Sequence, residues 1–359
     1  MATSPQSPFT FPCGLTSKNR FMLAPLTNTQ SHQDGQLSEE EFTWLTKRAE
    51  GQFGIVMTCA SHVQANGKGF PGQLGIFSDI HTPGHQRLAS EIRRHGSLAL
   101  VQLHHAGMRS PEALIGERPV CPSDDEKTGA RALSLAEVEQ LRDDFIAAAV
   151  RAKQCGYDGV EIHGAHGYIL CQFLSSEFNH RTDAYGGSLE KRARLLFEIV
   201  EEVRKKCGAE FLLGVRLSPE RFGMDIAEIK WVCQQLIADG KIDFLDLSLW
   251  DCFKLPLEEK YQDQTLLEHF AALDFGKVLF TAAGRIRSGA DVHKALDGGL
   301  DFITAGQSGI LHHDFPKQVI NDPDFVPVAK PVSAAYLHGE AVSEKFVDYL
   351  RKRPGFILD

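Results

Sequence analysis

The sequence lacks three features that would each assign it to a broad class of protein. No apolar run approaches the about 20 residues that a membrane-spanning helix needs. The first residues, MATSPQSPFTFPCG, contain no basic segment followed by an apolar core, so we expect no secretory signal peptide. The formal net charge of -9 argues against a nucleic-acid-binding protein, which should carry a basic face. We therefore expect neither a membrane nor a nucleic acid as a partner.

Paired cysteines are also absent, although the chain contains eight cysteines. No two of them form a C-x-x-C motif, which disfavours a zinc or iron–sulfur centre. Scattered single thiols are typical of proteins kept reduced, so we expect a cytoplasmic location. No G-x-G-x-x-G motif follows a predicted strand, and we therefore expect no separate dinucleotide-binding domain.

Short apolar runs alternate with longer amphipathic stretches along the whole chain. The strand-like runs lie at 20–25, 53–60, 97–103, 158–164, 211–217, 242–248, 277–283 and 300–306. The helical stretches lie at 38–50, 84–95, 134–155, 188–207, 225–239, 263–274 and 288–298, and another begins near Phe315. Continuous apolar strands indicate burial on both faces, as in a parallel sheet. Eight strand–helix units predict an α/β fold, a (β/α)8 TIM barrel, with a doubly wound sheet as the alternative.

Two predicted connections are too long to be simple turns. Residues 104–133 follow the third strand and residues 249–262 follow the sixth, both at carboxyl strand ends where barrels build their active sites. We predict that both insertions form lids over the site. Residues 9–21 are expected to form a hairpin that plugs the opposite end, and the chain ends in one more helix. With no linker in the sequence, we expect residues 1–359 to form a single domain.

Polar residues and glycines collect where the predicted strands end. Because all strands of a barrel end at one mouth, these residues should converge there. The residues in question are Pro25, Leu26, Thr27, Ala60, Gln102, His163, His166, Tyr168, Arg216, Ser248, Gly284, Arg285, Gly306 and Gln307. Together, glycine-rich last loops, a cation and an amide predict a phosphorylated planar cofactor. In isolation, Arg216 could instead pair with a carboxylate inside the barrel, and Gln102 could be a satisfied core amide.

The stretch EIHGAHGY places two histidines three residues apart, with a tyrosine two residues further on. A zinc site needs three or four ligands, and His163 and His166 supply two, so we predict no metal, with a purely structural pair as another alternative. Two ring N–H groups could instead donate to one oxygen, with Tyr168 beside them. That arrangement suits chemistry in which a carbonyl oxygen gains charge while a neighbouring carbon takes a proton.

Several motifs resemble the Old Yellow Enzyme family of FMN-dependent ene-reductases. They are FMLAPLTN, GIFSD, VQLHHAG, GVRLSP and the long central stretch EIHGAHGYILCQFLSSEFNHRTDAYGGSLEKRARLLFEIV. The resemblance runs from about residue 9 to residue 320. It implies a single TIM-barrel domain that holds FMN at its carboxyl mouth.

The resemblance also implies roles for the residues at the strand ends. Thr27 resembles the residue that bonds flavin O4, Pro25 and Ala60 resemble backbone contacts to the ring, and Gln102 and Arg216 resemble the groups at N1 and O2. We expect the remaining cofactor contacts at Leu26, His163, Ser248, Gly284, Arg285, Gly306 and Gln307. NAD(P)H would visit transiently and pass hydride to N5. An α,β-unsaturated carbonyl compound would then replace it, with His163 and His166 on its oxygen and Tyr168 as the proton donor.

The chain departs from the family pattern in its last loop. AGQSGILHHDFP has Gln307 where the family usually has an arginine that bonds the FMN phosphate, and Arg285 in the preceding loop is the candidate substitute. Two rival functions follow from the same motifs, a flavin-binding protein without turnover and an enzyme like dienoyl-CoA reductase. A homo-oligomer is compatible with the sequence.

Overall fold

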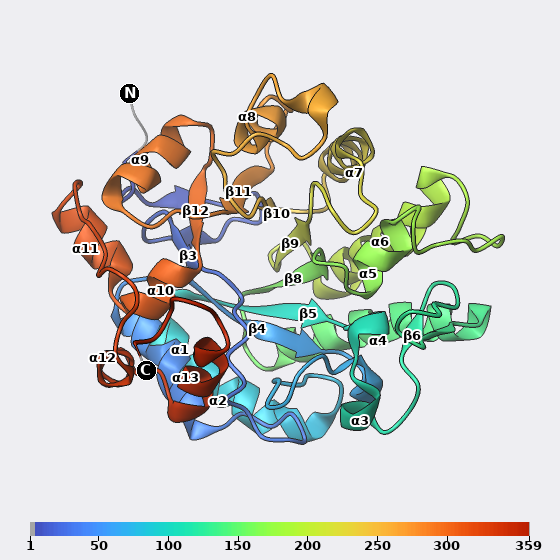
Figure 1. Cartoon of the computed structure of the whole chain (residues 1–359), viewed down its shortest axis with the longest axis horizontal. Coiled ribbons are helices and arrows are strands. Elements are labelled where there is room, and N and C mark those ends of the chain that lie inside the picture. The colour runs from blue at the N-terminus through green and yellow to red at the C-terminus, as the bar shows by residue number, and fades with distance from the viewer. Residues whose placement is uncertain (1–3, 359) are drawn as a thin grey trace.

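Eight parallel strands close into a barrel in the computed structural model, which describes residues 4–358 (Figure 1). The barrel strands are β3 (Phe21–Leu23), β4 (Ile55–His62), β5 (Leu98–His104), β8 (Gly159–Gly164), β9 (Leu212–Leu217), β10 (Phe244–Ser248), β11 (Leu279–Ala283) and β12 (Phe302–Ala305). Each lies within or closely overlaps a predicted run. The predicted α/β TIM barrel is confirmed, and the doubly wound alternative is wrong because β12 pairs with β3 and closes the sheet. Residues 1–3 and 359 of the predicted domain lie outside the described residues.

Helices surround the barrel in the predicted order. They are α1 (Glu39–Glu50), α2 (Thr82–Arg94), α4 (Leu135–Gln154), α6 (Leu189–Cys207), α7 (Ile226–Asp239), α8 (Leu266–Ala271), α9 (Gly289–Asp297) and α11 (Phe315–Asn321). Local chemistry sets their starts. At α4, Ser134 accepts from the Glu137 N–H, while the Glu137 side chain accepts from the Ser134 N–H, so the first turn is capped in both directions. No helix of the described chain is both long and apolar enough to cross a membrane.

Several short elements were not predicted from the sequence. They are the helices α3 (Glu112–Ile115), α5 (Ile169–Leu174), α10 (Gln307–Leu311) and α12 (Ala334–Gly339), and the paired strands β6 (Val120–Cys121) and β7 (Arg131–Ala132). The long connection after β5 holds α3, β6 and β7, and the one after β10 holds a 3-10 turn, Glu259–Tyr261. The helices are too short for the 3.6-residue period to stand out from a loop, and the two-residue strands are too short to show an alternating pattern.

The predicted N-terminal hairpin is present and fills the amino end of the barrel. Strand β1 (Phe9–Thr10) pairs antiparallel with β2 (Thr16–Ser17). Phe9 stacks on Phe302 with ring centroids 5.2 Å apart, and Phe11 packs near Phe244 at 5.9 Å. Fully burying such a side chain stabilises a fold by roughly 1.5–3 kcal/mol. Because aromatic rings fill this end of the barrel in the described part of the chain, a ligand finds room at the carboxyl end.

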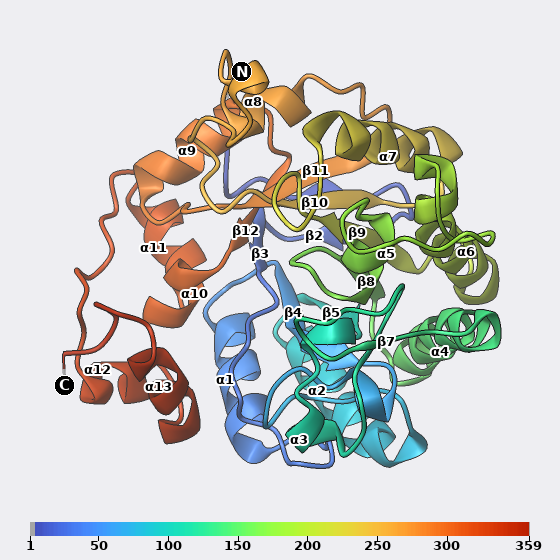
Figure 2. The ribbon, with the colours of Figure 1, turned by 45° about the vertical axis from the view of Figure 1, so that its right-hand side comes forward.

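The C-terminal helix α13 (Glu344–Arg351) lies against α1 rather than extending away from the barrel (Figure 2). The Phe346 ring meets the Trp44 ring edge-on at 5.5 Å, and the Lys345 ammonium pairs with the Glu40 carboxylate at 3.1 Å. This docking carries the end of the chain to the rim of the barrel mouth, where Arg353 contributes to the wall of the site.

Candidate active site

A cavity of about 910 Å³ opens at the carboxyl ends of the barrel strands. Its size is within the range of small-molecule and cofactor pockets, about 300–1,000 Å³. The predicted residues that line it are Pro25, Leu26, Thr27, His166, Tyr168, Arg216, Ser248, Gly284, Arg285, Gly306 and Gln307. Ala60, Gln102 and His163 are not part of its surface in this structure. The convergence expected for a barrel thus brings most of the predicted site together.

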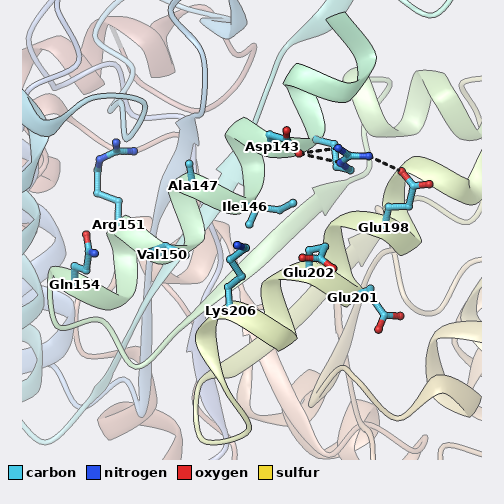
Figure 3. Close-up of a pocket in the computed structure, with 11 residues that line it drawn as sticks. Asp143, Ile146, Ala147, Val150, Arg151, Gln154, Glu198, Glu201, Glu202 and Lys206 are labelled. Carbon is cyan, nitrogen blue, oxygen red and sulfur yellow. Dashed lines mark hydrogen bonds and ion pairs between the residues drawn. The ribbon is translucent and has the colours of Figure 1, made fainter. Parts of the chain in front are cut away.

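A second large cavity, of about 780 Å³, lies between α4 and α6 on the outside of the barrel (Figure 3). Its wall carries charges of both signs, including the Arg142–Glu198 ion pair at 3.5 Å, and none of the predicted site residues. The candidate site is therefore the cavity at the strand ends.

The two histidines of strand β8 face one another. His163 Nε2 and His166 Nδ1 are 3.2 Å apart, and His166 Nε2 is 2.6 Å from the hydroxyl oxygen of Ser248. The Ala165 N–H donates to His163 Nδ1 at 3.3 Å. Burial is the main reason that the pKa of each histidine is well below its usual range, so both rings are neutral at pH 7. Each neutral ring carries a single N–H.

Tyr168 lies beside this pair. Its ring is edge-on to His104 at 4.4 Å and to His163 at 5.2 Å, and the Arg109 guanidinium lies 4.7 Å from the ring centroid. Burial raises the pKa of the Tyr168 hydroxyl, so it keeps its proton at neutral pH and can serve as a donor. Arg109 also donates to the His166 carbonyl oxygen at 2.5 Å, which ties the tyrosine and the histidine to one loop.

Buried polar groups lie beneath the cavity, inside the barrel. Gln102 Nε2 donates to Glu161 Oε1 at 2.6 Å, and Arg216 Nε is 3.1 Å from Asp246 Oδ2. Burial raises the pKa of Glu161 well above its usual range, and the nearby Asp246 raises it further. Burial also raises the pKa of Asp246, but the Arg216 guanidinium and the hydrogen bond to Glu161 oppose that shift, so the proton is favoured on Glu161 and the charge on Asp246 beside Arg216. The sequence left open that Gln102 is a hydrogen-bonded core amide and that Arg216 pairs with a carboxylate inside the barrel, and the structure shows both. Arg216 also lines the cavity.

Cations gather where strands β11 and β12 end. Lys330 Nζ donates to Gln307 Oε1 at 2.9 Å. Burial lowers the pKa of Lys330, and the charges of Arg287, Arg353 and Arg285 lower it further, so these four cations lie close together. Arg287 Nε is buried with no hydrogen-bond partner among the described residues. Arg285, the predicted substitute for a phosphate ligand, has Asp251 at 3.4 Å.

The charge of the cavity wall is one-sided. Six arginines line it, and no aspartate or glutamate does so in the described part of the chain, although the whole protein carries a formal charge of -9. Such a wall concentrates positive potential and favours an anionic ligand group. The cation cluster at the ends of β11 and β12, with its unsatisfied guanidinium nitrogen, fits a phosphate in particular.

Several lining residues were not predicted from the sequence. They are Ala24, Arg109, Arg221, Phe222, Trp250, Ala283, Ile286, Arg287, Thr304, Tyr349 and Arg353. Arg287 belongs to the same glycine-rich loop as Arg285 and could have been included on that ground. Tyr349, Arg353 and Lys330 come from beyond residue 320, where no motif pointed to the site. No three His, Cys, Asp or Glu side chains within residues 4–358 are grouped to hold a metal ion.

Comparisons with known proteins agree with this geometry. The sequence model of the NADH:flavin oxidoreductase / NADH oxidase family matches residues 7–322. A probable NADH-dependent flavin oxidoreductase of Bacillus subtilis is 37% identical over 323 residues, covering 87% of this chain and 86% of the relative. The structure of an Old Yellow Enzyme homologue from Zymomonas mobilis is similar, with a TM-score of 0.80 and 28% identity, covering 97% of this chain and 99% of that chain. Morphinone reductase in complex with tetrahydroNAD has a TM-score of 0.78 and 25% identity, covering 93% of this chain and 94% of that chain.

Proposed function

Because this chain belongs to the NADH:flavin oxidoreductase / NADH oxidase family, we propose that it reduces the C=C bond of α,β-unsaturated carbonyl compounds. The family identifies it as an NAD(P)H-dependent oxidoreductase with FMN as its cofactor, and the resemblance to Old Yellow Enzymes is confirmed. The reduction of the C=C bond itself is our proposal. One observation carries it: two neutral histidines present ring nitrogens 3.2 Å apart beside a protonated tyrosine.

The residues of the cavity fit FMN. We propose that Pro25, Leu26 and Thr27, which line the cavity, hold the ring and that Arg216 holds its pyrimidine edge. Ala60 and Gln102 lie beneath the cavity surface, and we propose that they support the ring and its pyrimidine edge from there. Gly284, Arg285, Gly306 and Gln307 lie at the end where a phosphate suits the cation cluster, and the structure adds Arg287, Arg353 and Lys330 to that set. When bound, FMN would supply the hydride-transfer chemistry that links NAD(P)H to the β-carbon of the substrate.

The side chains at the mouth supply binding and proton transfer. His166 lines the cavity and His163 lies directly beneath its surface, with its Nε2 3.2 Å from His166 Nδ1. Each donates one N–H to the substrate's carbonyl oxygen, where negative charge grows as the double bond is reduced. Two such donors in a buried site stabilise that charge more than water does. Tyr168, held between His104 and Arg109, gives its proton to the α-carbon. Burial keeps the pKa of this hydroxyl raised, so the proton stays on the oxygen until carbanion character develops.

Two measurements on the purified protein test the proposal. The mass of the cofactor released on denaturation should be that of FMN. Oxidation of NADPH or NADH should accelerate when cyclohexenone is added, with cyclohexanone as the product. A yellow protein that releases FMN but shows no cyclohexenone-dependent oxidation would instead be a flavin-binding protein without this turnover. A strong preference for thioester substrates would indicate activity like that of dienoyl-CoA reductase.

We also propose that residues 1–359 act as one FMN-binding barrel domain in the cytoplasm. The insertions after β5 and β10 are the proposed lids, because both border the carboxyl mouth and contribute Arg109 and Trp250 to the cavity wall. Trp250 is half exposed, at 50%, and the Arg221 guanidinium lies 4.7 Å from its ring centroid, so this side of the mouth has an apolar surface ready to cover a ligand. Limited proteolysis with and without cofactor checks this, since a lid should be protected when the site is filled.

A further inference from the structure

The hydrogen bonds around the histidine pair constrain where each ring carries its proton. A neutral imidazole has one N–H donor and one acceptor nitrogen. His163 Nδ1 accepts from the Ala165 N–H, so His163 carries its proton on Nε2, the nitrogen that faces His166. This assignment follows from the backbone donor and does not depend on any ligand.

His166 can then carry its proton on either nitrogen, and the free site and the occupied site require different tautomers. With no oxygen between the rings, His163 Nε2–H donates to His166 Nδ1 at 3.2 Å, and the His166 proton lies on Nε2, where Ser248 Oγ accepts it at 2.6 Å. A substrate oxygen that receives an N–H from both rings requires the other form of His166. Its proton must then be on Nδ1, and Nε2 becomes an acceptor.

We propose that Ser248 is a positioning residue that lets His166 change tautomer when a carbonyl oxygen or oxyanion binds. This inference rests on the proposed function. A hydroxyl can both accept and donate, so Ser248 accepts from Nε2–H in the free site and donates to Nε2 in the occupied site. The protons balance: His166 has one ring proton and Ser248 one hydroxyl proton before and after, and only their positions change. A carboxylate at this place would hold the proton on Nε2, and alanine would leave Nε2 unpaired.

Other groups already hold His166 in place, so the effect of Ser248 is on which ring nitrogen of His166 carries the proton. The backbone of His166 is already held, because its N–H donates to Ser218 Oγ at 2.9 Å and its carbonyl accepts from Arg109. Its φ of 63° lies in the left-handed region, so the turn fixes the direction in which the side chain leaves the backbone. The charged groups that bear on His166 are Arg216 and Arg109, and both lower its pKa after burial does. A doubly protonated imidazolium is therefore not an alternative donor.

Nitrogen NMR of the flavin-loaded protein, with 15N-labelled histidine, tests the proposal directly. The probe is 4-hydroxybenzaldehyde, whose phenolate oxygen should bind between the two rings. In the parent protein the proton of His166 should move from Nε2 to Nδ1 on binding, while His163 keeps its proton on Nε2. A parent protein that binds the phenol without this change overturns the inference, whatever the variants do.

Two substitutions at one position separate protonation from structure. Ser248→Ala leaves Nε2 without a donor, so the probe's Kd should rise roughly 5- to 100-fold. Ser248→Thr keeps the hydroxyl and should restore most of the affinity together with the tautomer change. Equal losses in both variants, or an unchanged Kd in Ser248→Ala, would contradict the role given to the hydroxyl. If the parent itself binds no phenol, the oxyanion site of the proposed function is wrong, and this inference falls with it.

Discussion

Replacing Lys330 by alanine should weaken FMN binding through the loss of its ammonium group. Lys330 Nζ donates to Gln307 Oε1 at 2.9 Å, and the neighbouring Arg285, Arg287 and Arg353 lower its pKa after burial does. Like charges held this close repel one another, and a phosphate among them relieves that repulsion. Hydrogen bonds to charged groups contribute about 1.5–3 kcal/mol. Lys330 is only partly buried, so we expect a contribution of about 1 kcal/mol, or a roughly fivefold to tenfold rise in Kd.

A substitution at Gln307 tests the same cation cluster in the opposite direction, by adding a charge. Gln307→Arg adds a charge-assisted donor for phosphate, but in the parent it also places a guanidinium against the Lys330 ammonium. The substitution should therefore tighten FMN binding more in the Lys330→Ala background than in the parent. Arg285→Ala should have a smaller effect than Lys330→Ala, because Asp251 at 3.4 Å already neutralises part of its charge.

Titration of the apoprotein with FMN, followed by quenching of flavin fluorescence, measures all of these values. Riboflavin is the matched ligand, since it lacks the phosphate, and Lys191→Ala on the outer helix α6 is the matched lysine control. The Kd ratio of riboflavin to FMN should fall in Lys330→Ala and stay at the parent value in Lys191→Ala. A ratio that does not change in Lys330→Ala would mean that the phosphate lies elsewhere.

Three further predictions concern the histidines and the buried acids. Replacing His163 and His166 together by alanine should abolish the long-wavelength absorbance band of bound phenol while FMN stays bound. Burial lowers the pKa of His85 to about 4. Between about pH 6.5 and pH 4 only the unfolded chain takes up this proton, so the free energy of unfolding should fall as the pH drops through that range. His85→Gln should make the free energy of unfolding, measured in urea titrations, less dependent on pH. Asp246→Asn should lower the free energy of unfolding by less than the roughly 3–5 kcal/mol of a broken buried ion pair, because Glu161 can ionise in its place. The double variant Asp246→Asn/Glu161→Gln should lower it by more than the two single variants combined.

The barrel could be predicted because its strands are buried on both faces. Runs such as 211–217 and 300–306 are apolar throughout, and that pattern needs no tertiary information. The convergence of His166, Arg216 and Ser248 followed from the fold, since parallel strands end at one mouth. Family resemblance then supplied the roles of these residues, which spacing alone left open.

The rest of the site depends on packing that no local pattern records. Arg353 reaches the cavity on a C-terminal segment whose Phe346 packs on Trp44, a contact between segments about 300 residues apart. Gln102 is predicted at the pyrimidine edge of the cofactor, and the sequence does not show that its amide also donates to Glu161 inside the barrel. The sequence shows which residues follow each strand. The hydrogen-bond partner of a buried polar side chain depends on which strands lie next to it in the barrel, and the sequence does not show that.

The role of Tyr168 is tested most directly by measuring the two half-reactions of Tyr168→Phe separately by stopped flow. In the first, NADPH bleaches the flavin absorbance, which requires no proton from Tyr168. In the second, cyclohexenone restores the absorbance, and this step needs the hydroxyl. General acid catalysis typically contributes about 100- to 10,000-fold. Tyr168→Phe should slow the second half-reaction by such a factor and leave the first within about twofold, a change of under 1 kcal/mol in barrier. Equal slowing of both half-reactions, or no slowing of the second, would contradict this role of Tyr168.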